Sequence, residues 1–139
     1  MKKLISCSVV ALLSMPALAG PYDQVYSIVS AEFVKSADYK LQPVILNRID
    51  GDSTTRRQEA IAPGQHTIYA DLPASQEHHQ HIATQNSLAI DFKPCTRYYI
   101  AARLTDSVTR HWQLVIRDSE TIGECAAKYL KSAEAGTAK

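Results

Sequence analysis

The chain has 139 residues, with 15 basic and 14 acidic side chains and a formal net charge of +1. A chain of this length forms one domain with a hydrophobic core. The near-neutral charge excludes the basic stripe of nucleic-acid-binding domains and the polybasic patch that binds anionic lipid, so we expect no nucleic-acid partner.

The first nineteen residues have the organisation of a secretory signal peptide. Lys2 and Lys3 form a basic start, residues 4–15 form an apolar run, and Ala17-Leu18-Ala19 is a small-x-small cleavage site before Gly20. We expect cleavage at this site, which leaves 120 residues with 13 basic and 14 acidic side chains, a formal charge of −1.

The alternative for this segment is lipid attachment at Cys7. Residues 4–7, Leu-Ile-Ser-Cys, look like the tetrapeptide of a bacterial lipoprotein signal. A lipid-anchored cysteine should follow the apolar core, whereas most of this core comes after Cys7. The style of the signal is bacterial, so we expect a periplasmic or secreted protein. No later segment approaches the ~20 apolar residues of a spanning helix, so the mature chain should have no transmembrane segment.

The first half of the mature chain has irregular patterns. Residues 22–35 fit both a helical face and a strand exposed on both faces, and we favour the strand. Pro43 stands just before an apolar segment, where a missing N–H is tolerated, and Asp-Gly and Pro-Gly pairs favour turns. The elements expected here are strands over residues 44–49, 58–61 and 67–72 and turns over residues 49–52 and 62–65.

Two short motifs in this half carry a resemblance. Ile49-Asp50-Gly51 and Ala62-Pro63-Gly64-Gln65-His66 are similar to small bacterial envelope domains of the PEGA type, in which an I-D-G turn and a P-G-x-H turn punctuate a compact sandwich. The resemblance covers about residues 40–72, and the chain continues beyond it for three more strands. The later stretch from Cys95 to Cys125 looks like uncharacterised secreted proteobacterial proteins. The resemblance implies an extracytoplasmic β-sandwich with a binding or accessory role, and it carries over no functional residues.

Residues 73–85 are polar and should form a loop, which contains Glu77-His78-His79-Gln80-His81. Neutral imidazoles are ligands for copper, zinc and nickel. His79 and His81 share a face of an extended chain and could chelate a metal, with an oxygen from Glu77 or Asp71. The alternative is a polar loop that is rich in histidine, because a structural zinc site normally shows four clear ligands.

In the second half, apolar and polar residues alternate over residues 87–93, 97–105 and 111–117. A period of two with one apolar face indicates half-buried antiparallel strands. Together with the strands of the first half, these segments predict an all-β fold, an antiparallel β-sandwich of six or seven strands. The inward residues are Leu88, Ile90, Phe92, Tyr98, Ile100, Ala102, Leu104, Trp112, Leu114 and Ile116.

Residues 106–109 suit a hairpin turn between the last two of these strands. Matching their apolar faces pairs Leu104 with Trp112, Ala102 with Leu114 and Ile100 with Ile116, and places Cys95 near Thr121. That position is about four residues short of Cys125 in the same register. We expect Cys95 and Cys125 to form one disulfide, since they are the two cysteines left after cleavage in a chain directed to an oxidising compartment.

The outward residues of these two strands form the candidate binding surface, which consists of Arg97, Tyr99, Arg103, His111, Gln113 and Arg117. They make a polar stripe with cationic character, suited to a partner or an anionic ligand. The alternative is an ordinary solvated sheet face. Tyr98 and Trp112 lie on the inward face, so we expect them to pack in the core instead of forming an aromatic platform.

Residues 125–135 contain good helix formers and predict a short C-terminal helix. We expect one sandwich domain over residues 20–130 and a flexible tail over residues 131–139. The chain contains no G-x-S-x-G, H-E-x-x-H, P-loop or G-x-G-x-x-G motif.

These observations predict a non-enzymatic binding or accessory protein of the bacterial envelope. It would act through its surface on a protein or another envelope component and would need no cofactor. One alternative is a periplasmic metal-binding protein that uses His78, His79 and His81. Another is a hydrolase in which His66 or His111 meets a serine and a carboxylate in space.

Overall fold

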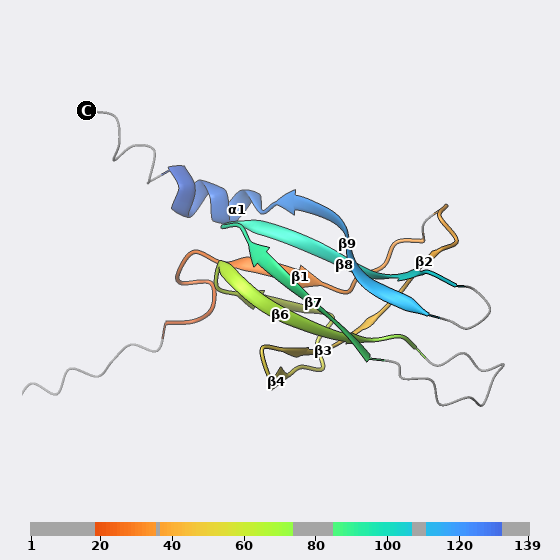
Figure 1. Ribbon diagram of the computed structural model, residues 1–139. Helices are drawn as coiled ribbons and strands as arrows, with labels where there is room; N and C mark the ends of the chain where they lie inside the picture. The colour runs from red at the N-terminus through yellow and green to blue at the C-terminus, as the bar shows by residue number, and fades with distance from the viewer. Residues whose placement is uncertain (1–18, 36, 74–84, 107–110, 132–139) are drawn as a thin grey trace, which may run out of the picture.

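The computed structural model describes residues 19–35, 37–73, 85–106 and 111–131, which form two β-sheets and a short C-terminal helix (Figure 1). Sheet A contains β1 (Ser27–Ser30), β2 (Leu41–Gln42), β5 (Gln58–Ile61), β8 (Thr96–Leu104) and β9 (Trp112–Thr121). Sheet B contains β3 (Ile45–Ile49), β4 (Asp52–Ser53), β6 (Gly64–Asp71) and β7 (Gln85–Phe92). The predicted all-β sandwich is therefore confirmed.

Sheet A is built around β8, which has β9 on one side and both β1 and β2 on the other. The pairing of β1 with β8 is parallel, and the other strand pairs among the described residues are antiparallel. The predicted antiparallel sandwich therefore contains one parallel pair. Alternation along a strand reports which face is buried but says nothing about the direction of a distant neighbour.

The β3–β4 hairpin confirms the turn predicted over residues 49–52. Ile49 pairs with Asp52, and the two residues between them, Asp50 and Gly51, have positive φ angles of 55° and 133°. Tight two-residue hairpins of this kind require positive φ at both central positions, which Asp-Gly tolerates. The second predicted turn leads into β6 at Gly64, which also has a positive φ of 118°.

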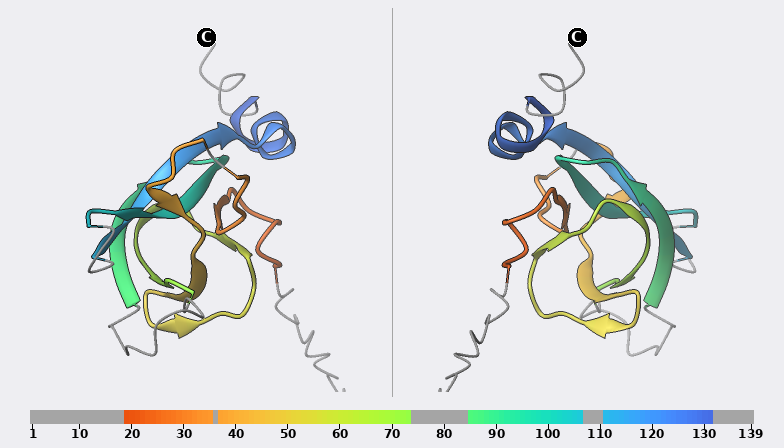
Figure 2. Two further views of the ribbon diagram at one scale, coloured as in Figure 1. Left: turned by 90° about the vertical axis from the view of Figure 1, so that its right-hand side faces the viewer. Right: turned by 90° about the vertical axis from the view of Figure 1, so that its left-hand side faces the viewer.

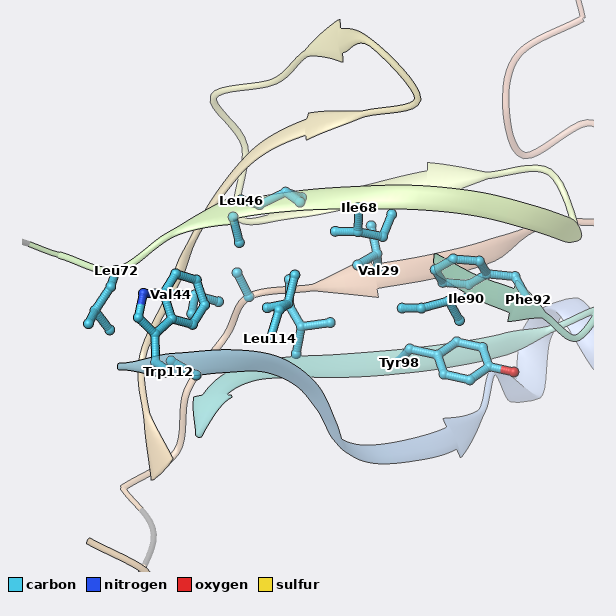
Figure 3. Close-up of a cluster of buried hydrophobic side chains, with 14 residues drawn as sticks. Val29, Val44, Leu46, Ile68, Leu72, Ile90, Phe92, Tyr98, Trp112 and Leu114 are labelled. Carbon is cyan, nitrogen blue, oxygen red and sulfur yellow. The ribbon is translucent and has the colours of Figure 1, made fainter. Parts of the chain in front are cut away.

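The main core lies between the two sheets, and the labelled side chains in Figure 3 point into it from both. The inward faces predicted for β6, β7 and β8 are confirmed, and so are the core positions of Tyr98 and Trp112. The ring of Tyr98 packs edge-on against Phe92, and its hydroxyl accepts a hydrogen bond from the backbone N–H of Lys93. The buried members are Val29, Ala31, Val44, Leu46, Ile68, Ala70, Leu72, Ile90, Phe92, Tyr98, Ile100, Ala102, Trp112 and Leu114.

Strand β1 is buried on both faces, so the prediction of a strand exposed on both faces was wrong. Val29 points into the main core, whereas Ile28 points to the other side, where the C-terminal helix covers it. Ser27 is also buried, and its hydroxyl still has a hydrogen-bond partner, because Oγ donates to the carbonyl of Lys93 at 2.6 Å. The strand nature of this segment is confirmed, but it is limited to four residues.

The β8–β9 pairing contains all three residue pairs that the apolar faces predicted. Beyond Ile100–Ile116 the register shifts, because Arg117 is an extra residue opposite no residue of β8. As a result, β9 continues to Thr121, four residues past the predicted end, and the N–H of Ile122 donates to the carbonyl of Cys95 at 2.8 Å. Ile116 is 43% exposed despite its inward direction, because β9 lies at the edge of sheet A.

The predicted disulfide between Cys95 and Cys125 is present, with a Cα–Cα distance of 5.3 Å. It anchors the C-terminal helix, which consists of α1 (Gly123–Cys125) and the π-helical η1 (Ala126–Leu130). The helix was predicted and begins two residues earlier than expected. Figure 1 shows it at one end of the molecule, where β9 ends, and Figure 2 shows it outside sheet A. A second buried cluster forms beneath it, from Tyr26, Ile28, Cys95 and Cys125.

Candidate binding surface

The structure divides the predicted polar stripe into two groups on the outer face of sheet A. Arg97, Tyr99 and Arg117 belong to one interacting cluster, described below. Arg103 and Gln113 are opposite each other on β8 and β9, and both are exposed. His111 is exposed just before β9, and its carbonyl accepts the N–H of Thr105 at 2.8 Å.

Glu120 is the centre of the first group. It pairs directly with Arg97 across the strands, and the Nη1 of that arginine lies 2.8 Å from Oε1 of the carboxylate. The hydroxyl of Tyr99 donates to the same oxygen at 2.7 Å. The hydrogen bond from Tyr99, and after it the one from Arg97, lowers the pKa of Glu120 below its usual range. The same hydrogen bond raises the pKa of Tyr99.

Sequence reasoning missed Glu120 because it had no way to place the bulge. In the unshifted register, Glu120 lies beyond the predicted end of β9 and on the inward face. The extra residue Arg117 reverses the alternation after it, so that Glu120 lies on the outer face beside Arg97. The one available signal was compositional, because residues 117–120, Arg-Asp-Ser-Glu, are too polar for an inward strand face.

Arg117 lies between two aromatic rings. Its guanidinium carbon is 5.6 Å from the ring centroid of Phe33 and 5.6 Å from that of Tyr99. Its Nη1 also donates to the carbonyl of Val34 at 3.4 Å. The segment after β1 therefore packs on this face, and Ala101, an outward residue of β8, is completely buried. This part of the outer face of sheet A is therefore partly covered by other residues of the chain and is not an ordinary solvated sheet face.

A second polar constellation joins the two motifs that carried the family resemblance. Asp50 Oδ2 lies 2.5 Å from Nδ1 of His66, and Asp50 Oδ1 accepts the N–H of Thr67 at 2.8 Å. The hydrogen bond with His66, followed by that from Thr67, lowers the pKa of Asp50. Nε2 of His66 is 2.8 Å from the carbonyl of Ala62. Both ring nitrogens are thus engaged, so His66 has none to offer a serine or a metal.

The metal ligands proposed from the sequence, His78, His79 and His81, lie outside the described residues, as does Glu77. Asp71, the other suggested ligand, is described, and its Oδ2 accepts a hydrogen bond from Nδ2 of Asn47 at 2.6 Å. Within residues 19–35, 37–73, 85–106 and 111–131, no group of three or more His, Cys, Asp or Glu side chains is arranged to hold a metal ion.

Comparisons with protein-family models, with curated proteins and with solved structures found no match to this chain. Among the residues that the structure describes, no helix is long and apolar enough to cross a membrane. The disulfide is consistent with an oxidising compartment.

Proposed function

We propose that this protein is a non-enzymatic binding protein of the bacterial periplasm or extracellular medium. It acts through the outer face of sheet A on a protein or another component of the cell envelope. The signal-like N-terminus and the disulfide support this location.

One observation carries the proposal: Arg97, Tyr99 and Arg117 are pre-ordered on a face that solvent reaches. Arginine and tyrosine are enriched where proteins bind partners, and they dominate the binding energy there. Here the Tyr99 hydroxyl and the Arg97 guanidinium are held by Glu120, and the Arg117 guanidinium is held between two rings. Side chains that are ordered before binding lose less conformational entropy on association.

Site-specific photo-crosslinking in the producing bacterium tests this proposal. A photoreactive amino acid at Gln113, which is exposed on β9 four residues before Arg117, should give a discrete adduct. The same amino acid at Asp91, exposed on β7 of sheet B, is the matched control and should give none. The Gln113 adduct should disappear when Arg97 and Arg117 are both changed to Ala. An adduct that forms equally from both positions, or that survives the double change, would contradict the proposal.

The histidine-rich loop supports a second candidate function, the binding of copper, zinc or nickel. Three imidazoles within four residues, at positions 78, 79 and 81, are the observation that favours it. Its test is a calorimetric titration with these three metals, in which alanine at the three histidines should abolish stoichiometric binding.

A further inference from the structure

A pocket of about 510 Å³ opens on the outer face of sheet A, where β9 leads into the C-terminal helix. It adjoins the cluster described above, because Arg97 and Glu120 form one side of it. Its other walls come from the segment before β1, from β1 and β5, and from the start of the helix. The residues that matter for its chemistry are Tyr22, Ile28, Gln58, Arg97, Glu120 and Glu124.

The walls of this pocket are held together by the disulfide and by the backbone around it. The N–H of Cys95 donates to the carbonyl of Tyr26 at 2.8 Å, and the carbonyl of Cys95 accepts the N–H of Ile122 at 2.8 Å. At the far end of the helix, the hydroxyl of Tyr129 donates to the carbonyl of Tyr22 at 2.7 Å. Cys95 and Cys125 belong to the second buried cluster and not to the main core. The disulfide therefore secures this pocket more directly than it secures the sandwich.

The charges of the pocket disfavour an anionic ligand. Arg97 is neutralised by its ion pair with Glu120, and Glu124 adds an exposed carboxylate. The pocket offers carboxylate acceptors, guanidinium donors and the amide of Gln58, which both donates and accepts. A neutral ligand that carries several hydroxyl groups matches this set, because each hydroxyl both donates and accepts.

The aromatic side of the pocket is Tyr22, which is 55% exposed. Its ring packs edge-on against the buried ring of Tyr26, at a centroid distance of 5.0 Å and an interplanar angle of 87°. That contact and the hydrogen bond from Tyr129 to its carbonyl hold Tyr22 in place. An exposed tyrosine ring offers an apolar face beside a polar tip. It suits a ligand with one apolar face of C–H groups and a polar edge.

We propose that this pocket is a saccharide-binding site. A pyranose ring has the required combination of an apolar C–H face and an edge of hydroxyl groups. Tyr22 would contact the apolar face, and Gln58, Arg97 and Glu120 would bond the hydroxyls. The proposal rests on the proposed function, since it names a ligand class for the same face of sheet A.

The test is a calorimetric titration of the purified, oxidised protein with two soluble probes, triacetylchitotriose and maltotriose. Tyr22→Ala removes the stacking ring, and Tyr39→Ala is the matched control, because Tyr39 is 74% exposed and does not line the pocket. We expect saturable binding of at least one probe by the wild type and the control. Binding to Tyr22→Ala should be weaker by roughly tenfold. A second variant, Gln58→Ala, should also weaken binding.

Three results would overturn the proposal, two from the sugar titrations and one from a parallel titration with spermidine. The first is the failure of both probes to bind a protein whose thermal unfolding is normal, and the second is equal affinity in Tyr22→Ala and Tyr39→Ala. Binding of spermidine in place of the sugars would also overturn it, by showing that the carboxylates serve a cation. The Gln113 crosslink, repeated in Tyr22→Ala, separates the two proposals. If the chain with the photoreactive amino acid at position 113 gives an adduct but the protein binds no saccharide, this inference alone is refuted. If that chain, with no other change, gives no adduct, the proposed function is refuted.

Discussion

Removal of the disulfide should lower the free energy of unfolding, and the size of this loss depends on the number of residues between the two cysteines. The two cysteines are 30 residues apart, and closing a loop of that length lowers the entropy of the unfolded chain by about 12 cal/mol/K. At room temperature this corresponds to about 3.6 kcal/mol. For a domain of this size, such a loss lowers the melting temperature by roughly 15 °C.

The location of the disulfide adds a second, local expectation. Cys95 and Cys125 pack with Tyr26 and Ile28 under the C-terminal helix, whereas the main core lies between the sheets. The double variant Cys95→Ala/Cys125→Ala should therefore keep the pairing of β8 with β9 while the helix detaches more often. Backbone amides of residues 122–131 should exchange hydrogen faster, and those of Ile100 and Ala102 should stay protected.

The assay is urea unfolding of the wild type with and without reductant, beside the double alanine variant, together with hydrogen exchange. The variant and the reduced wild type should agree, since both lack the crosslink. A stability difference below about 1 kcal/mol would refute the entropic argument. Uniformly increased exchange across both sheets would refute the assignment of the disulfide to a local cluster. Two free thiols in the oxidised protein would refute both.

Three further predictions concern other parts of the molecule. Leu46→Ala, at a side chain only 2% exposed, should cost about 2–5 kcal/mol of unfolding free energy, whereas Ile45→Ala, one residue earlier and 56% exposed, should cost less than about 1 kcal/mol in the same urea assay. Because folding lowers the pKa of Asp50, its carboxylate stabilises the fold fully above the ordinary aspartate pKa and loses this effect as the pH falls through the lowered value. Asp50→Asn should therefore lose less stability than the wild type between about pH 5 and pH 2, and parallel curves would contradict this. In calorimetric titrations with copper, zinc and nickel, alanine at the three histidines of residues 78–81 should abolish stoichiometric binding; binding that this variant keeps would contradict the metal-site hypothesis.

The alternation of apolar and polar residues predicted most of the candidate surface. It did not predict the position of Glu120, which depends on one extra residue, Arg117. The positions of Arg97, Tyr99 and Arg103 on the outer face follow from alternation along β8. Glu120 joined them because the bulge at Arg117 moved the register by one residue. Residues 117–120 are all polar, so the sequence carries no apolar alternation there from which the position of the bulge could be read.

The sequence by itself determined all the strands except the two-residue β2 and β4, the inward faces of β6, β7 and β8, the three hairpin pairs and the disulfide partners. All of these follow from a period of two, from turn chemistry or from the number of cysteines. Only the tertiary structure decided that β1 lies parallel to β8 and is buried on both faces, that the ring of Phe33 lies against the guanidinium of Arg117, and that Tyr22 and Gln58 line one pocket with Glu120. These contacts join segments far apart in the chain, and the packing of two sheets and a helix selects them, which no local pattern encodes.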